Sequence, residues 1–179
     1  MGADIEIWTE IRNKKTGKWI RFEEEYFSVS DWERKTFNKI KAKYPFDWRS
    51  YSMFGFLADV RNYSECECIS EPKGLPTDSE YLNEDGYYSG GGGWGSNDIT
   101  KKREIETDGM SHSFSYLTLR ELLEFDYAKK FVDQRDNTDT YLKEITHREH
   151  LGGMFFVHLE ELKQLGEPDD VRIVFFFDN

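Results

Sequence analysis

Near its start the chain reads DIEIWTEIR at residues 4–12, and near its end it reads VRIVFFF at residues 171–177. The first stretch alternates, with Ile5, Ile7 and Thr9 on one face, which is the period-two pattern of a strand with one buried face. The second stretch is a continuous β-branched and aromatic run, typical of a well-buried strand. Because a buried strand needs neighbours on both edges, we expect the second stretch to pair near the first.

The residues that follow the first strand predict a hairpin and then two helices. A turn at residues 13–17 leads into the returning strand KWIRF at residues 18–22. Ser30 with Glu33 forms a capping-box pattern, which predicts a helix to about Lys43 with Trp32, Phe37 and Ile40 on one side. Apolar spacing predicts a second helix over residues 50–60.

The second half of the chain predicts two longer helices before the final strand. Another capping box, Thr118 with Glu121, starts a helix whose apolar face extends to Phe131. A last helix is expected over residues 157–165, ended by Gly166 and Pro168, and a short one near residues 78–82. Residues 141–147 fit either a strand or a helix.

These elements predict an α+β fold: a small, mostly antiparallel sheet from the N-terminal hairpin and the C-terminal strand, packed with about four helices. We expect a single domain over residues 1–179. Residues 62–111 are interpreted as a long irregular insertion or lid, because they contain Pro72, Pro76 and four consecutive glycines at residues 90–93.

Composition excludes several classes of protein. The 179 residues carry 24 Lys and Arg against 35 Asp and Glu, a net charge of −11, which argues against a protein that wraps nucleic-acid phosphates. Aromatic residues make up 16%, enough for a packed core, so disorder is not expected. No apolar run is long enough for a membrane span. The chain does not begin with a basic segment followed by an apolar one, so a signal peptide is not expected.

Two cysteines, Cys66 and Cys68, are the only ones in the chain. Their spacing is too tight for an ordinary structural disulfide and supplies only half of a cysteine-rich zinc site. We interpret them as structural thiols, with a metal or redox role as the alternative. Without a disulfide framework, the expected compartment is a reducing cytoplasm.

The first candidate site is a row of carboxylates on the non-core face of the first strand. Asp4 and Glu6 are about 7 Å apart if the segment is extended, so they could flank a divalent metal ion, the one cofactor that the pattern suggests. Glu10 continues the row, and Asp178 could join it if the terminal strands are neighbours. The alternative is an ordinary solvated sheet face. His147 and His150, spaced for one helix face, could bind a metal or could be structural.

The second candidate site would bind a small anionic ligand. His112 and Ser113 are expected in a loop that leads into a helix N-terminus, a place that favours anions. Arg61, at the end of the second predicted helix, could hold a phosphate or carboxylate. The remaining residues of this site are Asn62 and Tyr63 beside Arg61, and Trp8 and Trp94 as aromatic rings for base stacking.

Four short stretches of the chain share a distinctive order: residues 1–6 (MGADIE), 51–62, 72–78 (PKGLPTD) and 112–118 (HSFSYLT). Together with the end of the chain, residues 171–179, they resemble a family of uncharacterised proteins carried by bacteriophages and prophages. Glu6, Lys73 and Tyr116 stand where that family usually has His, Arg and Trp. The resemblance implies that the chain is a phage accessory protein that works in the host bacterial cytoplasm. It implies no particular activity.

Three functions follow as hypotheses. Phage accessory proteins of this size often counter host defence, so the first is a protein that binds a small nucleotide-like ligand of host defence signalling. The second is a metal-dependent hydrolase that uses Asp4, Glu6 and His112. The third is an acidic inhibitor or DNA mimic that binds a host defence protein. No membrane or direct nucleic-acid partner is expected, and an exposed hairpin edge would allow a homo-oligomer.

Overall fold

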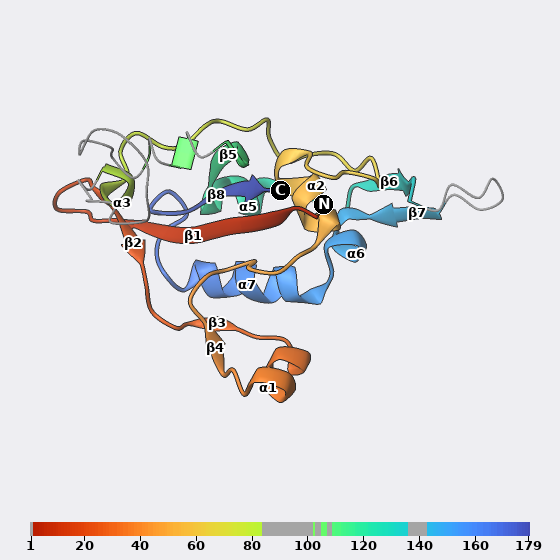
Figure 1. Ribbon diagram of the computed structural model, residues 1–179, viewed down its shortest axis with the longest axis horizontal. Coiled ribbons are helices and arrows are strands. Elements are labelled where there is room, and N and C mark those ends of the chain that lie inside the picture. The colour runs from red at the N-terminus through yellow and green to blue at the C-terminus, as the bar shows by residue number, and fades with distance from the viewer. Residues whose placement is uncertain (1, 84–101, 103–104, 107–108, 136–142) are drawn as a thin grey trace.

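The computed structural model describes residues 2–83, 102, 105–106, 109–135 and 143–179. Its centre is a four-stranded sheet in the order β2-β1-β8-β5, formed by β1 (Asp4–Arg12), β2 (Trp19–Phe22), β5 (Ser111–Thr118) and β8 (Val171–Asp178). All three pairings are antiparallel (Figure 1). The predicted α+β class is confirmed, and so is the pairing of the C-terminal strand with the N-terminal hairpin.

One face of the sheet carries the main core, as its alternation predicts. Ile5 and Ile7 of β1 share this face with Phe175 and Phe177 of β8, and all four side chains are buried. Helices α2 (Tyr51–Ala58) and α7 (Gly153–Lys163) cover it; Figure 1 shows α7 lying along this side of the sheet. The predicted helix over residues 50–60 is confirmed, with Ser50 as its N-cap.

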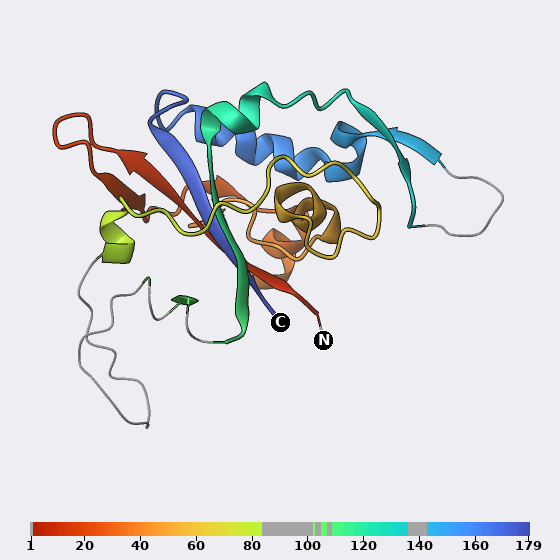
Figure 2. The same cartoon turned by 90° about the horizontal axis from the view of Figure 1, so that it is seen from above.

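The opposite face of the sheet carries a second, smaller core. Trp8, Val174 and Phe176 pack there against Leu75, which precedes α3 (Glu80–Asn83), and against Leu82 within α3. This segment lies over β1 and β8 in the view from above (Figure 2). The interpretation of this face as solvated holds at Asp4 and Glu6, which are exposed, and is wrong at Glu10, which is buried beneath residues 72–83.

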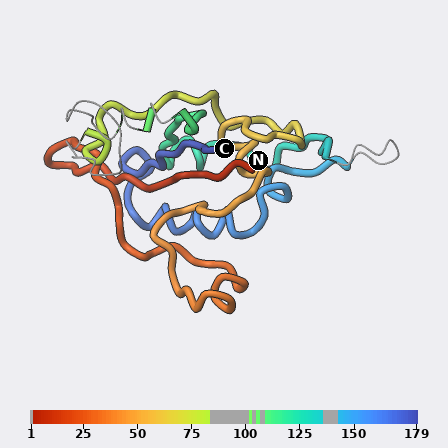
Figure 3. Tube along the Cα trace, viewed as in Figure 1, coloured from red at the N-terminus to blue at the C-terminus, as the bar shows by residue number. Residues whose placement is uncertain are grey.

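The helix that begins after Ser30 is shorter than predicted. Helix α1 (Asp31–Phe37) has the predicted capping box, but Asn38 adopts a left-handed conformation at φ 53° and ends it. The chain then returns as β4 (Lys41–Ala42), which pairs with β3 (Phe27–Ser28). The result is a small hairpin that projects away from the sheet beyond α7, and Figure 3 shows this projection in the path of the chain.

The predicted long helix after Thr118 is wrong in its second half. Helix α5 (Leu119–Glu124) ends after six residues, and β6 (Lys130–Asp133) follows, paired with β7 (Lys143–Thr146). The Tyr127 hydroxyl donates to the Leu122 carbonyl, so the chain turns back on itself there. The loop predicted at His112 and Ser113 is also wrong: both residues lie in strand β5, the outer strand beside β8.

The remaining helices account for the candidate histidine pair. Helix α6 (His147–Leu151) follows β7, and α7 begins four residues before its predicted start. His147 and His150 are both buried among the rings of Phe125 and Phe131, which favours their structural interpretation. Both cysteines are free thiols. In the described part of the chain, no helix is long and apolar enough to cross a membrane.

The buried His150 predicts a loss of stability in mild acid. Desolvation and the nearby Arg135 charge lower the pKa of His150 to about 4, while its value in the unfolded chain is near 6.5. The unfolded state therefore binds more protons between these two values, and stability falls as the pH drops through that window. We expect wild type to lose about 1–2 kcal/mol between pH 7 and pH 5 in urea denaturation.

The matched control is His150→Gln, which keeps a polar group beside the Ser64 hydroxyl, 3.1 Å from the His150 Nε2 in the wild type. This variant should show a clearly smaller change between the two pH values. An unchanged wild-type stability from pH 7 to pH 5 would contradict the assignment.

Candidate functional site

The structure brings four of the residues predicted to bind an anion to one end of the sheet. The Asn179 side chain connects them: its Oδ1 accepts from the Arg61 guanidinium at 3.4 Å, and its Nδ2 lies 3.0 Å from the His112 Nε2. Tyr63 is within 3.5 Å of the Arg61 guanidinium, and the Ser113 hydroxyl is 3.0 Å from the His112 Nδ1. We call these five residues the polar cluster.

The contacts of Asn179 select one tautomer of the neutral His112 ring. A guanidinium only donates, so the amide oxygen must face Arg61 and the amide NH2 must face His112. The His112 Nε2 then accepts, and its Nδ1 carries the proton and donates to the Ser113 hydroxyl. In this arrangement the Ser113 hydroxyl accepts from the imidazole, so His112 is not set up to take a proton from Ser113.

The other residues predicted for this site have different roles. The Asn62 side chain closes its own loop, donating to the Asp59 carboxylate at 2.7 Å and the Cys66 carbonyl at 2.8 Å. A Cβ at Gly55 would lie 2.7 Å from Asn62 Oδ1, so this loop packs onto α2 only because residue 55 is glycine. Trp8 is buried on the second face of the sheet, and Trp94 lies outside the described residues.

The carboxylates of the predicted metal site differ in their partners and in their exposure to solvent. Asp4 is held by Arg49 through two hydrogen bonds of 2.7 and 2.6 Å. Glu6 is exposed, and partial desolvation together with the charges of Asp178 and Asp47 raises its pKa. Glu10 is fully buried and paired with Arg172. Within the described ranges, no group of three or more metal-ligating side chains comes together.

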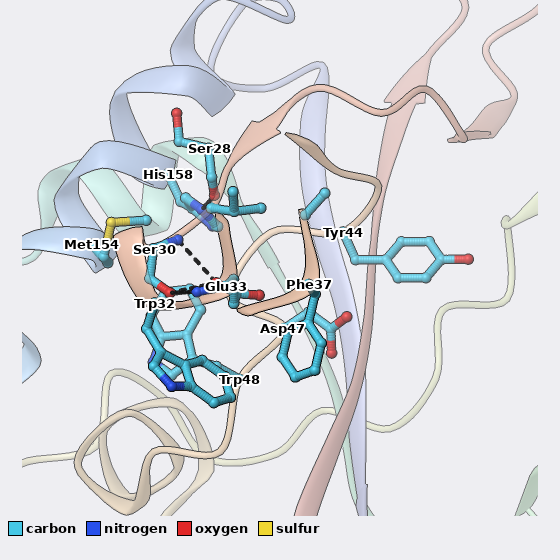
Figure 4. A pocket seen from close by; sticks show the side chains of 12 residues that line it. Ser28, Ser30, Trp32, Glu33, Phe37, Tyr44, Asp47, Trp48, Met154 and His158 are labelled. Carbon is cyan, nitrogen blue, oxygen red and sulfur yellow. Dashed lines mark hydrogen bonds between the residues drawn. The ribbon is translucent and has the colours of Figure 1, made fainter. Parts of the chain in front are cut away.

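A pocket that the sequence did not indicate lies on the other side of the molecule, under the projecting hairpin. Its volume is about 440 Å³, and residues of β3, α1, the loop 44–48 and α7 line it (Figure 4). These four segments are separated by up to 130 positions in the chain. We call it the α1 pocket.

His158 of α7 forms part of the wall of the α1 pocket, and its two ring nitrogens are engaged by backbone. Its Nδ1 accepts from the Phe46 N–H at 2.9 Å, so its Nε2 carries the proton and donates to the Ser28 carbonyl at 2.7 Å. Desolvation lowers the pKa of His158, in keeping with this neutral form. His158 therefore joins β3 and the loop 44–48 to α7, and it is not available as a general base.

The rim of the α1 pocket is aromatic and open to solvent. Trp32 is 64% exposed and Phe37 is 62% exposed, and their rings meet edge to face with centroids 5.1 Å apart. Trp48 stands deeper, edge-on to His158 at 5.2 Å. Helix α1 contributes no buried residue to the core. Trp32 and Phe37 of the predicted apolar side therefore lie on this helix and line the pocket, whereas Ile40 follows the end of the helix and is exposed.

The carboxylates that line the α1 pocket are those of Glu33 and Asp47. Hydrogen bonds from the Ser30 amide and hydroxyl lower the pKa of Glu33, although desolvation opposes them. Asp47 has no such bonds, and desolvation raises its pKa. No lysine or arginine lines the pocket among the described residues, and Lys39 lies outside it, 3.9 Å from Glu33.

Comparisons of this chain with family models, with curated proteins and with solved structures find no match. The resemblance to phage and prophage proteins therefore stays a prediction.

Proposed function

We propose that the protein binds a small organic molecule in the α1 pocket. The observation that carries this proposal is the exposure of Trp32 and Phe37 on a helix that buries no residue of its own. A volume of about 440 Å³ falls within the range of pockets that bind small molecules. A ligand between these rings and Trp48 would cover apolar surface that the fold leaves exposed.

The energetic argument concerns the two exposed rings. A Trp or Phe side chain offers roughly 150–250 Å² of surface, and burial is worth about 25 cal/mol per Å². A ligand that covers much of the exposed area of both rings would gain on the order of 3–5 kcal/mol from this term alone. The capping box of Ser30 and Glu33 holds the short helix in place, so less ordering is needed when the ligand binds.

The chemistry of the pocket favours binding over catalysis and disfavours phosphates. His158 has both ring nitrogens engaged, and the two carboxylates that line the pocket would repel an anion. A nucleotide-like ligand held by Arg61 and His112 would have to use the polar cluster instead, and that remains a separate prediction. Phage origin, action against host defence, hydrolysis and inhibition of a host protein also remain predictions.

The experiment is a fragment screen by ligand-observed NMR, followed by titration of the hits. Trp32→Ala should weaken the binding of pocket hits by at least tenfold, because a large part of the ring that they contact is removed. The same variant should change the free energy of unfolding by less than about 1 kcal/mol, because Trp32 makes no core contact.

Tyr63→Ala is the matched control, since Tyr63 is also an exposed aromatic residue but belongs to the polar cluster. It should leave the hits unaffected. Hits that bind wild type and Trp32→Ala equally, or that are lost only in Tyr63→Ala, would show that the α1 pocket is not the site.

A further inference from the structure

The charge at the mouth of the α1 pocket identifies the class of its ligand. Asp47 is exposed, and no hydrogen bond or ion pair to its carboxylate is present among the described residues. Figure 4 shows this carboxylate on the same side of the pocket as Phe37. Resting on the proposed function, we propose that the ligand is an organic cation, with an alkylated ammonium group among Trp32, Phe37 and Trp48 and its charge facing Asp47.

The aromatic rings suit a cation of this kind. The face of an aromatic ring attracts positive charge, most strongly for Trp, and groups of such rings recognise quaternary ammonium ligands. Trp32, Phe37 and Trp48 all line the pocket. The Tyr44 ring is directed away in Figure 4, because Arg21 donates to its hydroxyl at 2.5 Å and lies 5.1 Å from its centroid. Tyr44 is thus occupied by a cation of the protein itself, and the other three rings remain for a ligand.

The acids supply the second part of the argument. The Glu33 carboxylate already accepts hydrogen bonds from Ser30, whereas Asp47 receives none, and desolvation by the surrounding protein raises the pKa of Asp47. A carboxylate whose ionised form is costly gains most from a positive partner. The charge of Lys39 lowers the pKa of Asp47 and the charge of Glu33 raises it, and Lys39 already interacts with Glu33. A ligand cation would therefore complete the charge balance of the pocket.

The pocket also favours an alkylated ammonium over a primary one. A primary ammonium has three N–H donors and therefore needs several acceptors. Ser30 already donates to the Glu33 carboxylate, so Asp47 supplies most of the carboxylate oxygens that remain as acceptors. A trimethylammonium group needs no acceptors, and its methyl groups contact rings directly.

The test compares choline with 3,3-dimethylbutan-1-ol, its neutral isostere, by tryptophan fluorescence and calorimetry on the full chain. Benzyltrimethylammonium is a second probe that fills more of the pocket. Both cations should bind wild type, choline at least tenfold more tightly than the isostere. Asp47→Asn should weaken choline about tenfold without changing the weak binding of the isostere, and Lys39→Met should strengthen choline severalfold.

Equal binding of choline and the isostere would overturn the inference while leaving a small-molecule pocket in place. Binding of neither cation would overturn it as well, and the fragment screen would then decide independently whether the pocket binds any ligand. An anionic fragment that binds more tightly to Asp47→Asn and more weakly to Lys39→Met than to wild type would show that the ligand of the pocket is an anion, which would overturn the inference.

Discussion

Arg172→Met should destabilise the protein by about 3–5 kcal/mol, because it leaves the Glu10 carboxylate buried without its cation. Arg172 and Glu10 face each other on neighbouring strands, and their side chains are 4% and 0% exposed. The Arg172 guanidinium lies 2.7 and 2.9 Å from Glu10 Oε2, and its other amino group is 2.8 Å from Asp78. Urea denaturation at pH 7 measures the loss.

The structure explains why removing one partner is so costly. Glu10 also accepts from the Trp8 indole at 3.0 Å and from the Ser79 hydroxyl, so its carboxylate is held in place and cannot turn toward water. Arg172 lies over the Trp19 ring, 4.2 Å from its centroid, so the variant also loses a cation–π contact.

A double variant separates the charge from the packing. Glu10→Leu with Arg172→Met removes both charges, and it should be more stable than Arg172→Met alone, because an apolar pair of similar volume replaces a broken ion pair. A loss below 1 kcal/mol in Arg172→Met would contradict the buried pairing.

Phe155→Ala should cost about 3–5 kcal/mol, the range for truncating a large buried aromatic residue. Phe155 of α7 is fully buried and stacks on Phe46, with ring centroids 4.7 Å apart and an angle of 23°. It also meets Phe56 of α2 edge to face at 5.8 Å. The substitution opens a cavity where α7, α2 and the loop 44–48 meet, and thermal or urea denaturation reports it.

Phe156→Ala is the control, because it removes the same type of ring from the next position. Phe156 is only partly buried and packs against Tyr127 and Arg148, so we expect a loss of about 1–2 kcal/mol. Equal losses in the two variants would mean that Phe155 does not hold the interior contact described here.

The sequence predicts three of the four strands of the central sheet and misses β5, and the reason is local. A period of two in residues 4–12 requires only that one face be buried, which β1 satisfies. The apolar spacing from Leu119 to Phe131 matched a helix, but Tyr127 and Phe131 reach the core from a turn and a strand. Spacing shows that side chains are apolar and does not show which partner each one meets.

The candidate sites show the same limit more strongly. The proximity of Arg61 and His112 depends on Asn179, and the burial of Glu10 depends on Arg172, 162 positions away. Trp32 and Phe37 were visible as an apolar pair, but Asp47, Trp48 and His158 join them only because α7 packs behind the hairpin. A signal was available in residues 30–38, where a capping box is followed by aromatic residues and then by Asn38, an amino acid that tolerates a left-handed helix end.

The position of β8 between β1 and β5 has a consequence for how the protein folds. The β1–β8 pairing places Asp4 opposite Asp178. Neither β1 nor β5 can pair with β8 until residues 171–178 have been synthesised. Contacts between such distant residues require closing a long loop, so we expect slow folding for a domain of this size. During synthesis the first hairpin must wait with one edge unpaired, and this interval is when the chain is most exposed to aggregation.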